Sequence, residues 1–373
     1  MRILFLLLAS VPLMTTPITA AEQWAFIASP PDPQAIYRAT LNPETGELGQ
    51  LELAVEGIQT GFMALHPKLP ILYAGCADRI NGETQGVVRA YQFDSGIGEL
   101  EQISQSETND GSPTHIEVAP DGSSVAVCHY GGDGTTLIPL DDQGKLVETS
   151  LSQIKHQGSS VNEKRQTRPH PHGVAYHRDG NFLLVADLGN DHVEVFEITD
   201  DRQLRRKSYW QAAPGAGPRH VTFHSSLDVA YCINELDSTI SVLQLNPKSG
   251  ELSELQTVST LPENFSGNNT TAEVVVHPSG KFVYGSNRGH ESTAVFQVDT
   301  KTGKLSFVER EPTQGNHPRF VGLDRTGSVY LAANMQSNNI VSFRVNPDSG
   351  KLDPAGHTLE VQRPMCIVFA AKE

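Results

Sequence analysis

Short apolar runs, each bounded by Gly, Asp or Asn, recur along the whole chain. The clearest series is HGVAYH (172–177) and FLLVAD (182–187), followed by HVEVFEI (192–198), in which apolar and polar residues alternate. Runs of this length are typical of buried strands, and alternation is typical of a strand with one solvated face. No segment shows convincing amphipathic helical spacing, so the pattern predicts an all-β protein.

One short turn is repeated seven times between these runs. Its copies are NPETGEL (42–48), DSGIGEL (94–100), DDQGKL (141–146), TDDRQL (199–204), NPKSGEL (246–252), DTKTGKL (299–305) and NPDSGKL (346–352). In six of the seven, a glycine stands before a charged residue and a leucine, which predicts a hairpin turn in which Gly adopts a positive φ. A hairpin turn that recurs in this way indicates a repeat protein.

The spacing of the repeats predicts the architecture. The residue after the first strand of each unit recurs at intervals of 46 to 58 residues, at Pro67, Pro120, Arg178, Ser225, Pro278, Arg325 and Ala371. This interval fits four-stranded propeller blades of roughly 40 to 50 residues with loop insertions. The last unit has a first strand (365–369) and nothing after it, whereas segments 24–29, 34–41 and the segment after Leu48 match strands two to four.

We therefore predict an all-β, seven-bladed β-propeller with four antiparallel strands per blade, closed by a blade that combines N-terminal and C-terminal strands. Closing the ring in this way leaves no open sheet edge. Residues 1–21 carry Arg2, an apolar run from Ile3 to Met14 and a Thr-Ala-Ala exit, which is the pattern of a signal peptide. Residues 22–373 form a single propeller domain in this interpretation, and the protein is expected to be exported, periplasmic or extracellular.

The charge and the cysteines narrow the classes of partner. The formal net charge of −15 repels polyanions, which argues against nucleic-acid binding, and the chain has no second apolar stretch for a membrane anchor. Four cysteines, Cys76, Cys128, Cys232 and Cys366, fall in inner strands of different blades without metal-ligand spacing. We expect buried free thiols, with a Cys76–Cys128 bridge as the alternative. The sequence leaves the oligomeric state open and is compatible with a monomer.

Polar residues occupy equivalent positions in successive blades. In an up-and-down blade, the start of strand one and the end of strand two lie on the same face, and first strands line the channel. The starts of first strands carry His115, His170, His172, Arg219, His220, Glu273 and Arg319, and the ends of second strands carry His129, Asp187, Glu235, Asn287, Arg288 and Asn334. We expect these residues to converge on one mouth of the channel, beside the irregular insertions 156–168 and 261–271.

This constellation predicts an anion-binding pocket. Guanidinium groups bind carboxylate or phosphate oxygens in bidentate fashion, and a shielded pocket strengthens the pairing. A zinc site built from His170, His172 and His220 is disfavoured, because the HPH spacing directs two ligands the same way about 7 Å apart with no carboxylate at ligand spacing. We expect no metal and no cofactor.

The motifs in series resemble one enzyme family. They are RPHPH (168–172), DLGND (187–191), GPRH (217–220), NEL (234–236), AEVVVHPSGKFVYGSNRGH (272–290) and HPRF (317–320). Together they resemble the propeller lactonases, which contain bacterial 6-phosphogluconolactonase and are similar to fungal carboxy-cis,cis-muconate cyclase. The resemblance covers essentially all of the chain after the leader and implies a seven-bladed propeller without a metal requirement.

The resemblance also implies roles for individual residues. The catalytic set of the cyclase branch corresponds here to His172, Arg219, Glu235 and Arg288. Glu235 or His172 would activate water for attack on a sugar lactone or phospholactone, and the arginines would hold the anionic group and the oxyanion. The expected substrate-binding residues are His170, His220, Glu273, Arg319, Asn287 and Asp187.

Three functions remain open from the sequence. The first is a lactone hydrolase similar to 6-phosphogluconolactonase, although a leader conflicts with a cytoplasmic phosphorylated substrate and favours an unphosphorylated lactone. The second is a lactonising cyclase of the carboxymuconate type. The third is a non-catalytic propeller that binds protein or glycan; with 7% aromatic residues and a charged channel mouth, the chain offers little for such a surface.

Overall fold

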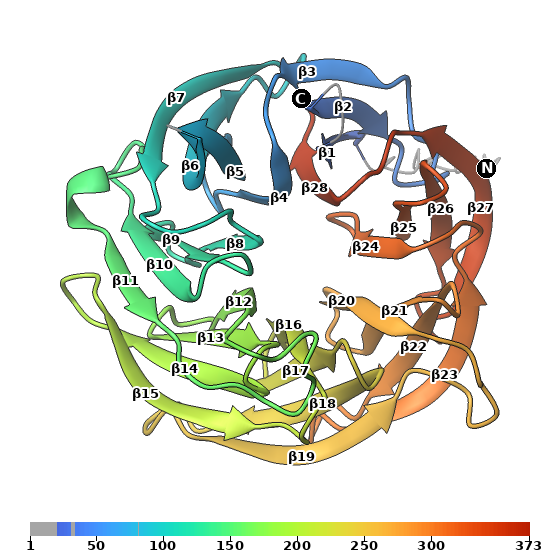
Figure 1. The fold of residues 1–373 in the computed structure, drawn as a ribbon. Helices are drawn as coiled ribbons and strands as arrows, with labels where there is room; N and C mark the ends of the chain where they lie inside the picture. The colour runs from blue at the N-terminus through green and yellow to red at the C-terminus, as the bar shows by residue number, and fades with distance from the viewer. Residues whose placement is uncertain (1–20, 31–33, 81) are drawn as a thin grey trace, which may run out of the picture.

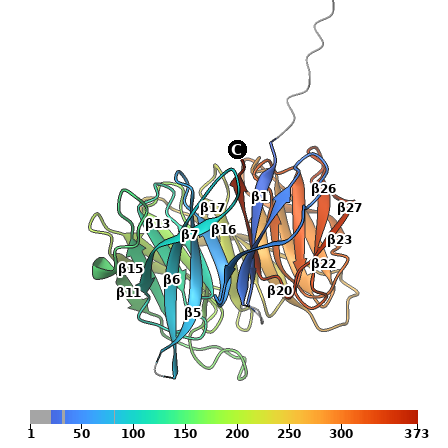
Figure 2. The same ribbon diagram turned by 90° about the horizontal axis from the view of Figure 1, so that it is seen from above.

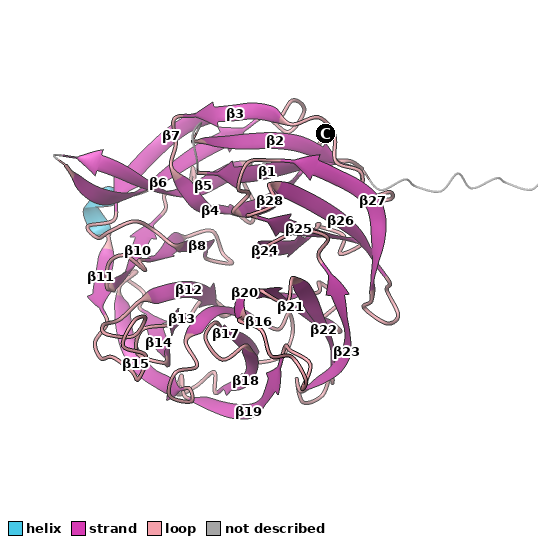
Figure 3. Ribbon diagram, turned by 45° about the vertical axis from the view of Figure 1, so that its right-hand side comes forward, coloured by secondary structure: helices cyan, strands magenta, loops and turns pink. Residues whose placement is uncertain are grey.

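The computed structural model describes residues 21–30, 34–80 and 82–373, and in this part the chain forms seven four-stranded antiparallel sheets arranged in a ring (Figure 1). Strands and loops make up almost all of the fold, with one 3-10 turn, Glu148–Ser150, within the same residues (Figure 3). The predicted seven-bladed β-propeller is confirmed.

Six blades are continuous in sequence. Their strands are β4 (Thr60–Leu65), β5 (Ile71–Ile80), β6 (Glu83–Phe93) and β7 (Leu100–Glu107); β8 (His115–Val118), β9 (Ser124–Cys128), β10 (Gly134–Pro139) and β11 (Ser152–Lys155); β12 (Pro171–Tyr176), β13 (Phe182–Asp187), β14 (His192–Ile198) and β15 (Leu204–Gln211); β16 (Pro218–Phe223), β17 (Val229–Asn234), β18 (Thr239–Leu245) and β19 (Leu252–Ser259); β20 (Thr270–Val276), β21 (Phe282–Arg288), β22 (Ser292–Val298) and β23 (Leu305–Pro312); and β24 (Pro318–Leu323), β25 (Val329–Asn334), β26 (Asn339–Val345) and β27 (Leu352–Glu360). The first strand of each blade lines the central channel (Figure 1).

The seventh blade closes the ring with strands from both ends of the chain. Its order is β28 (Cys366–Ala371), β1 (Gln23–Ser29), β2 (Ala35–Leu41) and β3 (Glu52–Glu56). The inner strand β28 pairs antiparallel with β1, from Gln23 opposite Ala371 to Ala28 opposite Cys366. This composition is the one that the sequence predicted.

The repeated turns join the third and fourth strands of each blade. Their glycines have positive φ, for example 81° at Gly46 and 70° at Gly98, as the turn pattern predicts. In the one copy without glycine, Arg202 occupies the left-handed region with φ 60°. The first residue of the turn fixes the chain in a similar way in several copies: Oδ1 of Asn42 accepts the backbone N–H of Glu44 and of Thr45.

The hydrophobic core is divided among the contacts between blades. Second strands such as β13, β17 and β25 are buried along their whole length, whereas the outer strands β7 and β19 are largely exposed. Each apolar cluster joins residues of adjacent blades, and the largest packs the closing blade against both of its neighbours. All four cysteines are buried free thiols, so the alternative of a Cys76–Cys128 disulfide is not realised.

Seen from the side, the blades form a disc, and the β5–β6 hairpin projects beyond it on one face (Figure 2). No helix among residues 21–30, 34–80 and 82–373 is long and apolar enough to cross a membrane. The predicted signal peptide, residues 1–21, lies outside the described residues except for Ala21.

Candidate active site

The start of each first strand pairs with the end of the second strand of its blade, which places the expected polar residues on one face. Pro171 lies opposite Asp187, Pro218 opposite Asn234, Thr270 opposite Arg288 and Pro318 opposite Asn334. The common face that blade geometry predicts is therefore observed. The loops 156–168 and 261–269 lead into first strands at this same face.

β-Bulges direct the key side chains of these first strands. The register shifts by one residue at His172, Arg219 and Arg319, each of which follows the proline that begins its strand. In β20 the shift falls between Thr271 and Val274 and includes Glu273. A bulge leaves its extra residue out of the ladder and changes the direction of its side chain. His172, Arg219, Arg319 and Glu273, which the sequence had singled out, therefore all lie at bulges, and Gly61 occupies the equivalent bulge in β4.

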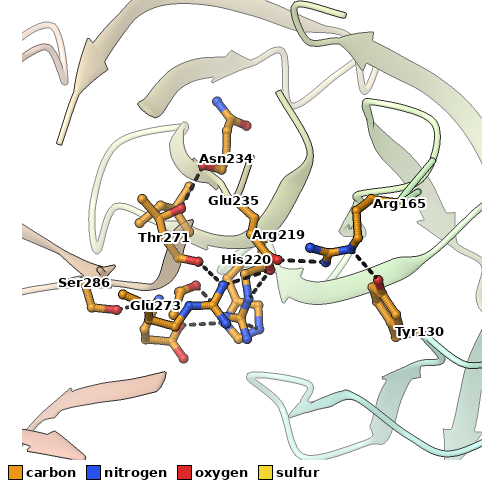
Figure 4. Close-up of polar contacts among 12 residues, drawn as sticks. Tyr130, Arg165, Arg219, His220, Asn234, Glu235, Thr271, Glu273 and Ser286 are labelled. Atoms are coloured by element: carbon orange, nitrogen blue, oxygen red, sulfur yellow. Dashed lines mark hydrogen bonds and ion pairs between the residues drawn. The ribbon is translucent and has the colours of Figure 1, made fainter. Parts of the chain in front are cut away.

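Glu235 is the centre of an ionic cluster drawn from several blades (Figure 4). Its Oε2 accepts a hydrogen bond from Arg219 Nε at 3.0 Å and lies 3.1 Å from Nη2 of Arg288. Its Oε1 accepts from Arg165 Nη2 at 2.7 Å. Carbonyl oxygens hold two of the arginines: Nη1 of Arg219 donates to Ala272 O and Nη2 of Arg288 to Thr271 O, both at 2.5 Å.

The charges in this cluster do not balance. Burial would raise the pKa of Glu235, but the three guanidinium groups outweigh it and lower that pKa to about 2. Burial and the positive charges of Arg288 and Arg319 lower the pKa of Arg219 to about 9. One carboxylate thus faces three guanidinium groups, and the excess of positive charge favours an anionic ligand.

A layer of aromatic rings lies beside the cluster. The ring centroids of His115 and His172 lie 4.6 and 5.1 Å from that of His220, and Phe62 packs against His115 at 4.1 Å. Burial, followed by nearby positive charge, holds the pKa of His172 and of His220 well below the usual range, so both imidazoles are neutral near pH 7.

Glu273 lies behind this layer. Its Oε1 is 2.7 Å from Nδ1 of His220 and accepts the backbone N–H of Val274, and burial raises its pKa to about 7. Nε2 of His220 faces Nη1 of Arg219 at 3.2 Å, which fits a tautomer with the proton on Nδ1. Three buried atoms of this region have no hydrogen-bond partner in the described part of the chain: His172 Nδ1, Glu273 Oε2 and Arg288 Nε.

A cavity of about 230 Å³ opens at this mouth of the channel. It is lined by Pro30, Gln59, Thr60, Gly61, Phe62, Ser112, Pro113, Thr114, Arg219, His220, Arg319 and Met365. Within the described part of the chain, Arg319 makes neither a hydrogen bond nor an ion pair. Burial and the charge of Arg288 lower its pKa to about 10, so its guanidinium is charged and available to a ligand.

The opposite mouth has a different character. A cavity of about 430 Å³ there is lined mainly by apolar residues, among them Leu65, Val275, Phe320 and Phe369. It lacks the group of arginines and histidines that marks the other mouth, so we place the candidate site at the Arg219–Arg319 end.

Three expected substrate-binding residues support loops instead of lining the cavity. Oδ1 of Asp187 accepts the backbone N–H of His170 at 2.7 Å, and its Oδ2 is 2.9 Å from His156. The amide of Asn287 bonds Thr260. His170 stacks on Tyr130 with a centroid distance of 4.4 Å and bonds its carbonyl oxygen. None of the three is among the residues that line the cavity.

The sequence reasoning missed Arg165, Tyr130 and Phe62. Arg165 lies in the insertion 156–168, where its charge reads as part of a polar loop, and it bonds both Glu235 and the hydroxyl of Tyr130. The position of Arg165 in this insertion could have indicated its role, because a basic residue in an irregular loop on this face is close to the channel mouth. No group of three His, Cys, Asp or Glu side chains suited to a metal ion occurs among residues 21–30, 34–80 and 82–373.

These features define a class: a closed seven-bladed propeller whose cationic, histidine-lined pocket lies at one end of the central channel. The chain belongs to the lactonase family of seven-bladed β-propellers, whose family model "Lactonase, 7-bladed beta-propeller" matches residues 24–369.

Comparisons with individual proteins agree with this assignment. The chain is 33% identical to a 6-phosphogluconolactonase of Bacillus subtilis, over 90% of this chain and 94% of that protein, and 30% identical to a 6-phosphogluconolactonase of Formosa agariphila, over 87% and 92%. Among solved structures, the periplasmic gluconolactonase of Pseudomonas aeruginosa superimposes with a TM-score of 0.86 at 26% identity, covering 95% of this chain and all of that one.

Proposed function

We propose that this protein hydrolyses a sugar lactone at the mouth of the channel. The observation that carries this proposal is Arg319, a guanidinium that has no partner among the described residues and lines the same cavity as Arg219 and His220. The names of the relatives support lactone chemistry, and the excess positive charge supports a substrate that carries or develops negative charge.

The chemistry requires a water molecule, a base and a site for the oxyanion. Water attacks the lactone carbonyl, the tetrahedral intermediate carries a negative oxygen, and the ring C–O bond then breaks as its oxygen takes a proton. We assign the base to His172, whose imidazole is neutral and whose Nδ1 has no hydrogen-bond partner among the residues that the structure describes. Arg219 and Arg288 are assigned to the oxyanion.

Glu235 is assigned a supporting role in the proposed mechanism. Both carboxylate oxygens of Glu235 are engaged by guanidinium groups, so neither is free to take a proton from water, and the contacts with Arg219, Arg288 and Arg165 orient those groups. Arg319 holds the phosphate of a phosphorylated lactone or, with an unphosphorylated lactone, the carboxylate group while its negative charge develops during ring opening.

Arg319→Gln is the variant that tests this function. Because Arg319 makes no hydrogen bond to any described residue, its loss should leave folding intact and lower kcat/KM by about 10- to 100-fold, as expected for a charged ligand contact. The assay follows acid release from glucono-δ-lactone and from its 6-phosphate. Arg325→Gln, at the opposite mouth, is the matched control and should behave as wild type.

The two substrates separate the remaining alternatives. A larger effect of Arg319→Gln on the phosphate ester would identify the phosphate as the group that Arg319 holds, and an equal effect would identify the carboxylate. Equal rates for Arg319→Gln and wild type on both substrates would contradict the assignment of Arg319. Failure of the wild type to open either lactone would contradict lactonase activity itself and favour the cyclase or a binding protein.

Export through the predicted leader belongs to the same proposal. The similarity to a periplasmic gluconolactonase supports it. Fractionation of cells that produce the full chain, with N-terminal sequencing of the product, tests both the compartment and cleavage near Ala21.

A further inference from the structure

Asp191 is a buried carboxylate that none of the catalytic roles above uses. It lies in the turn between β13 and β14, with a φ of 59°. Its Oδ1 accepts hydrogen bonds from Gln166 Nε2 and from the backbone N–H of Gly217, both at 2.7 Å. Its Oδ2 accepts from Ser160 Oγ at 2.5 Å and from the N–H of Gly215 at 2.7 Å.

These four donors belong to two separate loops. Ser160 and Gln166 lie in the insertion 156–168, and Gln166 directly follows Arg165. Gly215 and Gly217 precede Arg219 by four and two residues. The backbone oxygen of Asp191 also accepts the N–H of Ala212 at 2.8 Å, which fixes the start of the second loop.

The two loops carry arginines that bind opposite oxygens of one carboxylate. Arg165 reaches Oε1 of Glu235 and Arg219 reaches Oε2 (Figure 4). Asp191 thus joins the two loops through their Ser160, Gln166, Gly215 and Gly217 donors, while Glu235 joins the arginines themselves. The relative position of the two guanidinium groups depends on both links.

We propose that Asp191 is a positioning residue that holds the Arg165 and Arg219 guanidinium groups in the geometry required for anion binding. A carboxylate suits this position because it accepts four hydrogen bonds at once, whereas an amide oxygen accepts two and its nitrogen only donates. The effect on catalysis rests on the proposed lactonase function, but the effect on the geometry of the arginines does not.

The equivalent turns of other blades show which part of this arrangement is general. Ser238, Glu291 and Asn338 also have positive φ, of 60°, 52° and 58°. Their backbone oxygens accept the N–H of the residue that follows the fourth strand, as the oxygen of Asp191 does. The backbone bond is therefore a feature of the blade, and the four-bond side chain is particular to Asp191 among these four positions.

Asp191→Asn is the direct test, and Asn338→Asp is its matched control. In Asp191→Asn, an NH2 group replaces one carboxylate oxygen and faces two hydrogen-bond donors, so the two bonds that this oxygen accepted are lost. In Asn338→Asp, the aspartate still accepts the N–H of Arg363. We expect Asp191→Asn to lower kcat/KM for the lactone by about 10- to 100-fold, because small displacements of positioning groups reduce rates by such factors. Asn338→Asp should retain wild-type kinetics.

A double-mutant cycle and a spectroscopic signal distinguish positioning from a general loss of stability. If Asp191 acts through Arg165, the kinetic effects of Asp191→Asn and Arg165→Gln should be strongly non-additive. Solvent exchange of the Arg165 and Arg219 Hε protons, measured by NMR, should accelerate several-fold in Asp191→Asn and stay unchanged in Asn338→Asp. Gln166→Ala, which removes one link only, provides the same readouts if Asp191→Asn does not fold.

The outcomes separate the two proposals. Unchanged Hε exchange, or additive kinetic effects, would overturn the role of Asp191. Accelerated exchange in a protein that opens no lactone would support the role of Asp191 and overturn the lactonase function.

Discussion

At the scale of single residues, the site gathers positive charge in a protein that is negative as a whole. Arg165, Arg219 and Arg288 surround one carboxylate, and Arg319 adds a fourth guanidinium without a partner among the described residues. The chain as a whole carries a formal charge of −15. An anionic molecule would therefore be repelled by the general surface and attracted at this mouth.

Glu117, further along the channel on β8, is a partly buried carboxylate without an ion pair among the described residues. It accepts the backbone N–H of Tyr176 at 3.1 Å, and burial raises its pKa to about 8. A raised pKa in the folded state means that its contribution to stability is fully present below its unfolded pKa of about 4.5 and is lost as the pH rises through 8.

Glu117→Gln should therefore stabilise the protein at high pH. The amide oxygen keeps the hydrogen bond from Tyr176 and removes the partly buried charge. We therefore expect the free energy of unfolding to rise by about 2 kcal/mol at pH 9 and to change little at pH 4.5. Urea unfolding at several pH values measures the difference. A gain that is the same at pH 4.5 and pH 9 would contradict the assignment of this carboxyl.

At the scale of elements, the repeated turn docks each blade on its neighbour. The turn 94–99 packs on Trp24 of the closing blade, whose Nε1 donates to Ser95 O at 2.8 Å. Gly98 has a φ of 70°, and a Cβ at this position would lie 2.8 Å from Cδ2 of Trp24. The glycine therefore serves both the backbone conformation and the contact between blades.

Gly98→Ala should lower the free energy of unfolding by more than the strain of a positive φ alone accounts for. Gly57 has a similar φ of 74°, and a Cβ at that position would meet no atom within 4 Å, so Gly57→Ala isolates the cost of the backbone conformation. We expect the free energy of unfolding to fall by about 1 kcal/mol in Gly57→Ala and by about 3 kcal/mol in Gly98→Ala. Thermal or urea unfolding of both variants tests this, and equal losses would show that the contact with Trp24 adjusts without cost.

At the scale of the whole molecule, the ring depends on the pairing of β28 with β1. Without β28, the edge of β1 and the largest apolar cluster would be exposed, since Cys366, Ile367 and Ala370 belong to that cluster. The same strand begins next to Met365, which lines the candidate site. Closure therefore supports both stability and the site.

Truncation after Arg363 should prevent formation of a stable, soluble ring. Truncation after Ala371 is the matched control. It removes Lys372 and Glu373, and with them an ion pair between Lys372 and Glu22 that is worth about 0–1 kcal/mol, the cation–π contact of Lys372 with Trp24 and the hydrogen bond from Glu373 N–H to Ser95 O. Size-exclusion chromatography and thermal unfolding compare the two proteins. A soluble, cooperatively folded protein without β28 would contradict the closing role of this strand.

The sequence by itself determined the strands, the number of blades, the closing blade and the face that bears the polar residues. Each follows from local patterns: apolar runs of strand length, turns that require glycine, and the fixed spacing of one blade. Since every blade repeats the same register, residues at equivalent positions must share a face, which is why Arg219, Glu235 and Arg288 could be grouped before their contacts were known.

Only the tertiary structure decided which of these polar groups meet. The bulges at His172, Arg219 and Arg319 turn those side chains out of the ladder, whereas Asp187 and Asn287 are occupied by loops. Arg165 joins Glu235 across 70 residues of chain because Asp191 holds its loop in place. Such contacts depend on the distances between blades and on competition for hydrogen-bond partners, which no local pattern records.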